Sequence, residues 1–216
     1  MVRNTFVENP AREIECHNGI WCPLGRHDAW GKYAKRAPDM EFAVSRCPEH
    51  RTVIQAGGNI GAWPAWLAKR FERVHTFEPE TMNFRCLAKN MENRTNVFAY
   101  NAALSNEPRL AHLSLAKSLG GHHLTPEIGD TLATTIDVLD CHDVDFIMLD
   151  IEGWEFEALA GARITIERTH PVIQIEDRGH GIKKGNGKML EDILALLPGY
   201  RPVARVNRDV VLEYRK

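Results

Sequence analysis

An excess of charge of one sign and long apolar runs are both missing from this sequence. Its 216 residues carry 27 basic and 29 acidic side chains, a formal net charge of −2, which gives no bulk electrostatic attraction to nucleic acid or to an anionic membrane. No uninterrupted apolar stretch approaches the roughly 20 residues that cross a bilayer. The N-terminus carries a charge every few residues and has no apolar h-region, so we expect neither a secretory signal nor membrane association.

A disulfide pattern is also missing. Five cysteines, an odd number, do not make a disulfide framework in a chain of this size, and they favour a reducing, cytoplasmic compartment. The composition, 44% hydrophobic and 26% charged, excludes a fully disordered or collagen-like chain. The length is that of one ordinary domain, or of one domain with a small extra segment, and it suffices for a sizeable core.

The sequence changes in character near residue 50. Residues 1–50 show no sustained hydrophobic period and are crowded with Cys, His, Trp and Pro. From Arg51 onward, short apolar runs alternate with helical patterns, which predicts βαβ units around a parallel sheet. We therefore expect an N-terminal cap or lid over residues 1–50 and a ligand-binding domain over residues 51–216.

The predicted fold class is α/β: a Rossmann-like, doubly wound, mostly parallel seven-stranded sheet that ends in a C-terminal antiparallel hairpin. Short apolar runs mark the strands, which we expect at 52–56, 74–77, 97–102, 146–149 and 172–175, with the hairpin at 202–206 and 210–214. Apolar residues at helical spacing mark the helices, which we expect near 63–71, 84–91, 154–162 and 190–197. The stretch around 120–123 reads as irregular.

A glycine-rich turn over residues 55–61 is the first chemical signal. It lies between the first predicted strand and a helix, where glycines let the backbone turn sharply and let a ligand approach the main chain. The start of the helix offers free N–H groups that suit a carboxylate or phosphate. The alternative is an ordinary tight turn of a doubly wound domain, since such motifs also occur without a ligand.

An acidic residue at the end of the second strand favours the ligand interpretation. Glu78 follows Gly57 by 21 residues, a place and spacing suited to accepting hydrogen bonds from two ribose hydroxyls; the alternative is a solvated loop glutamate. The turn lacks the G-x-G-x-x-G spacing of dinucleotide folds. A nucleoside without a pyrophosphate therefore fits better, and S-adenosylmethionine (SAM) is the candidate.

Three carboxylates follow the fourth predicted strand, namely Asp150, Glu152 and Glu155. They project at the carboxyl edge of the sheet, where open α/β folds place their ligands. Crowded like charges are costly unless a positive group or a proton lies between them. The alternative is a helix N-terminus with acidic residues in its first turn, which suits Glu155 better than Asp150.

Taken in order, these motifs resemble those of the FkbM-type SAM-dependent methyltransferases, whose pattern is V-D-V-G-A-N-x-G, F-E-P followed by Asn, T-L-D, and K-I-D-x-E-G-x-E. The matching segments are 53–61, 77–79 with Asn83, 135–137 and 148–155, and the resemblance covers about residues 51–213. Two positions depart from the pattern. Gln55 replaces the acid that helps to hold the cofactor's ammonium group, which predicts a weaker contact, and Met148 replaces a frequent Lys.

The resemblance implies SAM as cofactor and O-methylation of a small hydroxylated acceptor, such as a sugar or a secondary metabolite. The residues expected to bind the cofactor are Gln55, Gly57, Gly58, Asn59, Gly61, Glu78, Pro79, Asn83, Ala103 and Asp150. The residues expected to take part in catalysis are Asp150, Glu152 and His180. His122 and His123 lie in a glycine-rich loop that we expect to close over the substrate.

The N-terminal segment holds Cys16, His17, Cys22 and His27, whose spacing matches no closed zinc site, so we expect no metal. Other functions stay open. Gln55 and Met148 motivate a binding module that keeps the SAM fold without catalysis. A nucleic-acid methyltransferase is disfavoured by the neutral charge and by the absence of a basic stripe with interleaved aromatics, and an NAD-dependent dehydrogenase is a further alternative.

Overall fold

The structure is a computed structural model that describes residues 13–177 and 188–215. Seven strands form the central sheet: β3 (Thr52–Ala56), β4 (Arg73–Phe77), β5 (Val97–Tyr100), β10 (Val144–Leu149), β11 (Val172–Glu176), β12 (Tyr200–Val206) and β13 (Asp209–Tyr214). Their order is β12-β13-β11-β10-β3-β4-β5. The five strands from β11 to β5 run parallel, and β13 and β12 add antiparallel neighbours. The predicted fold class, with its C-terminal hairpin, is confirmed.

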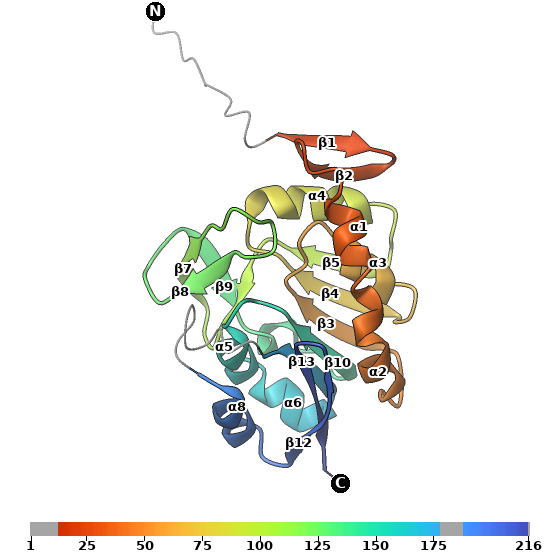
Figure 1. Ribbon diagram of the computed structural model, residues 1–216. Helices are drawn as coiled ribbons and strands as arrows, with labels where there is room; N and C mark the ends of the chain where they lie inside the picture. Colours follow the sequence, from red (N-terminus) through yellow and green to blue (C-terminus); the bar gives the residue numbers. More distant parts are fainter. Residues whose placement is uncertain (1–12, 178–187, 216) are drawn as a thin grey trace, which may run out of the picture.

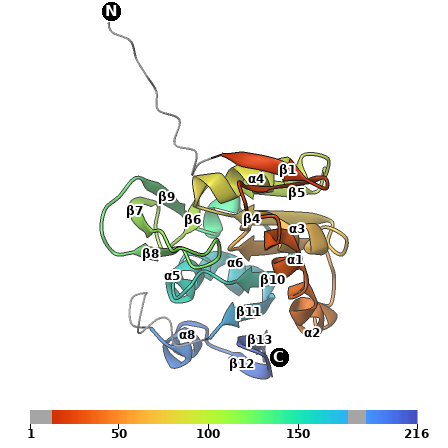
Figure 2. The ribbon, with the colours of Figure 1, turned by 45° about the horizontal axis from the view of Figure 1, so that its top comes forward.

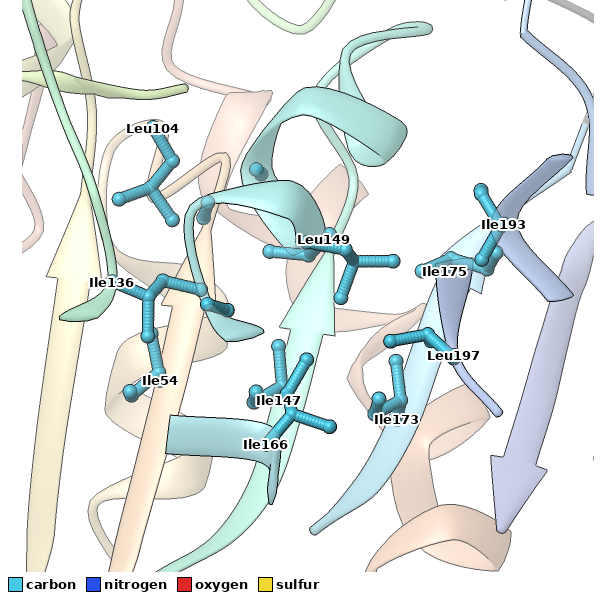
Figure 3. Packing of buried hydrophobic residues seen from close by; sticks show 14 of the residues in the cluster. Ile54, Leu104, Ile136, Ile147, Leu149, Ile166, Ile173, Ile175, Ile193 and Leu197 are labelled. Atoms are coloured by element: carbon cyan, nitrogen blue, oxygen red, sulfur yellow. The ribbon is translucent and has the colours of Figure 1, made fainter. Parts of the chain in front are cut away.

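Helices cover the central sheet on both faces (Figure 1). Every residue of β10 is buried, as the unbroken apolar run over residues 146–149 predicts for a strand between two helical layers. On one face, Ile147, Leu149 and Ile173 pack against three helices, and Figure 3 shows them beside Ile166 and Ile193 from two of these helices. These helices are α5 (Glu155–Ala160), α6 (Arg163–Thr169) and α8 (Leu190–Leu196).

The opposite face is covered by helices from both sides of β3 in the sequence. Met40, Val44 and Trp63 pack there against Val53 and Met148. The elements on this side are α1 (Ala29–Ala34), η2 (Ala37–Met40), α2 (Glu41–Ser45), α3 (Ala62–Leu67) and α4 (Thr81–Met91). Figure 2 shows α1, α2 and α3 on the side of the sheet away from α5 and α8. Part of the segment before residue 50 therefore shares a core with the sheet.

Two small sheets arise where the sequence showed no period. One is the hairpin of β1 (Ile14–His17) and β2 (Ile20–Pro23), which lies over α4 because the side-chain amide of Asn90 accepts from the Trp21 N–H and donates to the Trp21 carbonyl oxygen, both at 2.8 Å. The other lies beside α5 in both views, on either side of the predicted irregular stretch, of which only His123 enters a strand. It contains β6 (Ala103–Leu104), β7 (Arg109–Ser114), β8 (His123–Thr125) and β9 (Thr131–Thr134), and η3 (Asp137–Leu139) follows it.

The short strands explain why the second small sheet was missed. β6 has two residues and β8 has three, too few to show the alternation by which a strand is recognised. The third strand of the main sheet also ends at Tyr100 rather than at residue 102, since Ala103 already pairs with β9. In the described ranges, no helix is long and apolar enough to span a bilayer. None of the five cysteines forms a disulfide.

Gly161, which ends α5, gives a test of how tightly this layer is packed. A Cβ on Gly161 would come within 3.0 Å of the backbone carbonyl oxygen of Ser105, which cannot move without shifting the small sheet. We expect Gly161→Ala to lower the free energy of unfolding by about 1–3 kcal/mol, measured by urea denaturation. Gly31→Ala is the control, because nothing lies within 4 Å of its added Cβ in α1. Equal stability of the two variants would contradict the packing.

Candidate functional site

A cavity of about 300 Å³ lies at the carboxyl edge of the parallel strands, where open α/β sheets bind ligands and within the usual size range of about 300–1,000 Å³. Its walls come from the ends of β3, β4 and β10, from α1 and α3, and from the second small sheet. The predicted site residues that line it are Gly57, Gly58, Asn59, Glu78, Pro79, Ala103, Asp150 and Glu152, together with His122 and His123. Gln55, Gly61 and Asn83 do not line it, and His180 lies outside the described residues.

Glu78 is held inside the cavity wall and not in solvent. It is 5% exposed, and its two carboxylate oxygens accept hydrogen bonds from the backbone N–H groups of Asn59 (2.7 Å) and Glu80 (2.9 Å). Burial raises the pKa of Glu78 to about 7, against the opposing effect of these hydrogen bonds. The sequence-based alternative of a solvated loop glutamate does not describe this side chain.

The glycines of the first turn are required by the protein's own packing. Gly57 has φ +86°, and a Cβ there would come within 3.0 Å of the Asp150 carbonyl oxygen. A Cβ on Gly58 would lie 2.7 Å from the Thr76 hydroxyl oxygen. Both positions therefore need glycine whether or not a ligand is bound, which is a stronger constraint than the expected approach of a ligand to the main chain.

The side chain of Gln55 is buried on the sheet and is fully engaged there. Its Nε2 donates to the Ala56 carbonyl oxygen (3.0 Å), and its Oε1 accepts from the Thr76 hydroxyl (2.5 Å). The register places it beside Met148 on the neighbouring strand β10. The structure thus does not bring Gln55 to the cavity, and the two departures from the family pattern lie next to each other in the sheet interior.

Glu155 shapes the turn that carries the other acids. Its Oε1 accepts from the backbone N–H groups of Ile151 (3.1 Å) and Gly153 (3.3 Å). Burial raises the pKa of Glu155 to about 7. Between these residues Glu152 takes a left-handed backbone, φ +58°, of the kind that persists where the surroundings force it. Glu155 thus fits the alternative of an acidic residue in the first turn of a helix, here α5. Asp150 and Glu152 line the cavity instead.

Carboxylate oxygens of Asp150, Glu152 and Glu176 lie within 4.8 Å of one another, the one grouping in the described chain with the donors for a metal ion. The N-terminal residues instead contact each other: the rings of His17 and His27 stack at 4.3 Å, and His27 Nε2 lies 2.6 Å from Glu15 Oε1.

The segment after β7 is fastened to the glycine-rich turn, a feature that no sequence signal indicated. The carbonyl oxygen of Leu119 accepts from the side-chain amides of Asn59 (2.7 Å) and Asn83 (3.0 Å). Farther along, His122 Nδ1 accepts from the Ala116 N–H (3.0 Å), so the neutral imidazole carries its proton on Nε2. Burial lowers the pKa of His122. Asn83 therefore contributes to the site through Leu119.

Comparison with protein families adds to this geometry. Residues 55–202 match the family described as the Methyltransferase FkbM domain. The chain belongs to the FkbM methyltransferase family. The predicted family is thereby confirmed, and SAM is the cofactor of this FkbM chain. No curated protein matches the sequence.

Solved structures show the same fold. An FkbM methyltransferase from Methylobacillus flagellatus KT is 18% identical, with a TM-score of 0.54, over 86% of this chain and 58% of that one. The N-methyltransferase NodS from Bradyrhizobium japonicum WM9 is 8% identical, with a TM-score of 0.50, over 88% of this chain and 99% of that one. The present FkbM chain thus spans little more than half of the M. flagellatus protein.

The residues of the cavity suit the FkbM cofactor. Glu78 offers carboxylate oxygens for ribose hydroxyls, and Ala102, Ala103 and Leu104 give an apolar wall for a purine. Trp154 also lines the cavity, and its buried indole N–H meets no hydrogen-bond acceptor in the part of the chain that is described. An adenine ring nitrogen is an acceptor of the kind that would satisfy it.

The position of Gln55 in this FkbM chain leads to a test. Gln55→Glu removes the donor to Ala56 and places a carboxylate oxygen beside that carbonyl in a fully buried position. We expect it to lower the free energy of unfolding by about 1–3 kcal/mol and to leave the affinity of the folded protein for S-adenosylhomocysteine (SAH) no tighter. Gln55→Met is the apolar control. Tighter SAH binding, measured by calorimetry, would place residue 55 at the cofactor's ammonium group.

Proposed function

We propose that this protein transfers a methyl group from SAM to a hydroxyl group of a small acceptor, such as a sugar or a secondary metabolite. The observation that carries the proposal is Glu78, a buried carboxylate at the end of β4 that lines the cavity. Membership of the FkbM family supports the reaction class. In this arrangement the ribose binds Glu78, the adenine lies against residues 102–104, and the amino-acid end lies over Gly57 and Asp150.

When bound, SAM supplies an electrophilic methyl group. The chain's own task is then to hold an acceptor oxygen in line with that group, which supplies most of the rate enhancement, and to remove the hydroxyl proton, which adds about 10²–10⁴-fold. We assign proton removal to Asp150 or Glu152, both of which line the cavity. His122 donates through Nε2 while Nδ1 is occupied by Ala116, so we assign it to orienting an acceptor oxygen.

The alternatives are weaker on physical grounds. Gln55 and Met148 motivated a binding module without catalysis. Both are buried in the sheet and do not line the cavity, so these two departures from the family pattern do not change the chemical groups that face the cavity. A nucleic-acid methyltransferase is disfavoured by the formal net charge of −2. An NAD-dependent dehydrogenase predicts that NAD, and not SAH, raises the melting temperature, and a thermal-shift measurement with both compounds separates the two.

The proposed base gives the first test of catalysis. Asp150→Asn keeps the shape of the side chain and removes its capacity to accept a proton. We expect turnover of tritiated SAM with the best acceptor from a panel of sugars and phenols to fall by about 10²-fold or more, while SAH affinity changes far less. Asp130→Asn, an exposed carboxylate outside the cavity, is the control. If Asp150→Asn keeps full turnover, Glu152→Gln is expected to lose it; full turnover in both variants would remove the carboxylate base.

Glu78 makes cofactor binding depend on pH. Its raised pKa of about 7 means that the carboxylate must lose a proton before it accepts ribose hydroxyls, so SAH affinity should rise from pH 6 to pH 8 and level off above the pKa. In the ligand-free protein, the same shift makes the free energy of unfolding fall as pH rises from about 4.5 to 7. Calorimetric titrations at four pH values test the affinity. Glu78→Gln should be weak and flat, Glu107→Gln should match the wild type, and a flat wild-type profile would contradict the assignment.

A further inference from the structure

The strand order divides the cavity into two halves. Glu78 ends β4 and residues 102–104 follow β5, so the nucleoside in the proposed function occupies the half over these two strands. Asp150 follows β10 in the middle. Arg208, in the turn between β12 and β13, lines the cavity from beyond β11. The half between Asp150 and Arg208 is therefore left for the acceptor.

Three cations stand around this cavity. Lys32 lies in α1, Arg36 lies between α1 and η2, and Arg208 lies in the turn between β12 and β13 at the other end of the sheet. Neither Lys32 nor Arg208 forms an ion pair with any residue in the described ranges. Arg36 lies over the ring of Trp63, 5.6 Å from its centroid, and its Nε is 3.8 Å from Asp39.

The acids at the end of the sheet account for the positive groups of the cofactor but not for Lys32 and Arg208. Asp150 and Glu152 line the cavity, and their carboxylate oxygens lie within 4.8 Å of those of Glu176. In the proposed function the amino-acid end of SAM lies over this acidic group, and Glu78 is used by the ribose. Lys32 and Arg208 line the same cavity and form no ion pair within the described ranges, so an anionic acceptor supplies their negative partner.

We propose that the acceptor is a small molecule bearing a carboxylate or a phosphate close to the hydroxyl that is methylated, and that Arg208 binds this group with help from Lys32 and Arg36. The proposal rests on the proposed function, which places the cofactor in the other half. A guanidinium presents two parallel N–H donors that match either anion. Cations around a concave site also raise the local concentration of anionic ligands.

A small acceptor fits better than a nucleic acid. The cavity is bounded by residues 118–124 on one side and by α1 on the other, and the Leu119 carbonyl is fixed by Asn59 and Asn83. The formal net charge of −2 provides no broad basic surface for a polyanion. The three cations line this one cavity, which suits a single anionic group.

The experiment uses the full chain loaded with SAH and matched pairs of probes. One pair is D-glucose against D-glucose 6-phosphate or D-glucuronate, and the other is 3,4-dihydroxybenzyl alcohol against 3,4-dihydroxybenzoate. Calorimetry should show at least one anionic probe binding tenfold or more tightly than its neutral partner, and the sugar arms separate phosphate from carboxylate. Arg208→Met should remove most of this preference, and Lys32→Met part of it. Arg201→Met and Lys35→Met, exposed cations outside the cavity, should keep it.

Each other result has a defined meaning. If no anionic probe binds more tightly than its neutral partner, or if Arg208→Met keeps the preference, the proposal is overturned while the proposed function stands. If a ten-nucleotide RNA binds the SAH-loaded protein more tightly than every small anion, the acceptor class is wrong. If the wild type does not bind SAH, the proposed function fails first, and this inference fails with it.

Discussion

The close approach of β3 and β10 is the constraint on which the site depends. The two strands pair along their length, and where they end the Asp150 N–H donates to the Ala56 carbonyl oxygen. Gly57 turns away so close to the Asp150 carbonyl that no side chain fits between them. In the same turn, the N–H groups of Gly57 and Gly58 both donate to the Phe77 carbonyl oxygen. These hydrogen bonds join the ends of β3, β4 and β10. Glu78 and Asp150 follow these strand ends and line the cavity.

Two buried carboxylates, those of Glu78 and Glu155, hold the turns that follow these strands by accepting backbone hydrogen bonds. Glu78 accepts backbone N–H groups from two turns, and Glu155 accepts two from the turn after β10. Burial raises the pKa of both to about 7. Each carboxylate therefore loses hydration on folding, while its hydrogen bonds hold the backbone of the turn in place. Glu155 is used entirely in this role. Glu78 lines the cavity as well, which joins the shape of the turn to the proposed binding of the ribose.

The walls of the cavity come from segments that are distant in the sequence. The Leu119 carbonyl is held by Asn59 and Asn83, and the Trp63 indole N–H donates to the Tyr33 carbonyl oxygen (2.9 Å). Tyr33 in turn lies against Gly120, where an added Cβ would be 2.8 Å from the Tyr33 hydroxyl oxygen. α1, α3 and the segment after β7 are therefore mutually supported. Lys32 and Arg36, beside Tyr33 in this supported segment, line the same cavity as Arg208.

The sequence by itself determined the order of the seven strands of the central sheet and of the helices α3, α4, α5 and α8 between them, because apolar runs and periodicity depend on neighbours along the chain. It also indicated Gly57, Glu78 and Asp150, since the carboxyl ends of parallel strands meet at one edge wherever the sheet forms. Only the tertiary structure decided the rest. The short strands β6 and β8 carry no period of their own. The amide of Gln55 turns into the sheet because Thr76 and Ala56 satisfy it there. Lys32 and Arg208 line the same cavity only because the fold brings together residues 176 positions apart. Contacts of this length leave no local pattern, since each partner is an ordinary surface residue until the fold brings the two together.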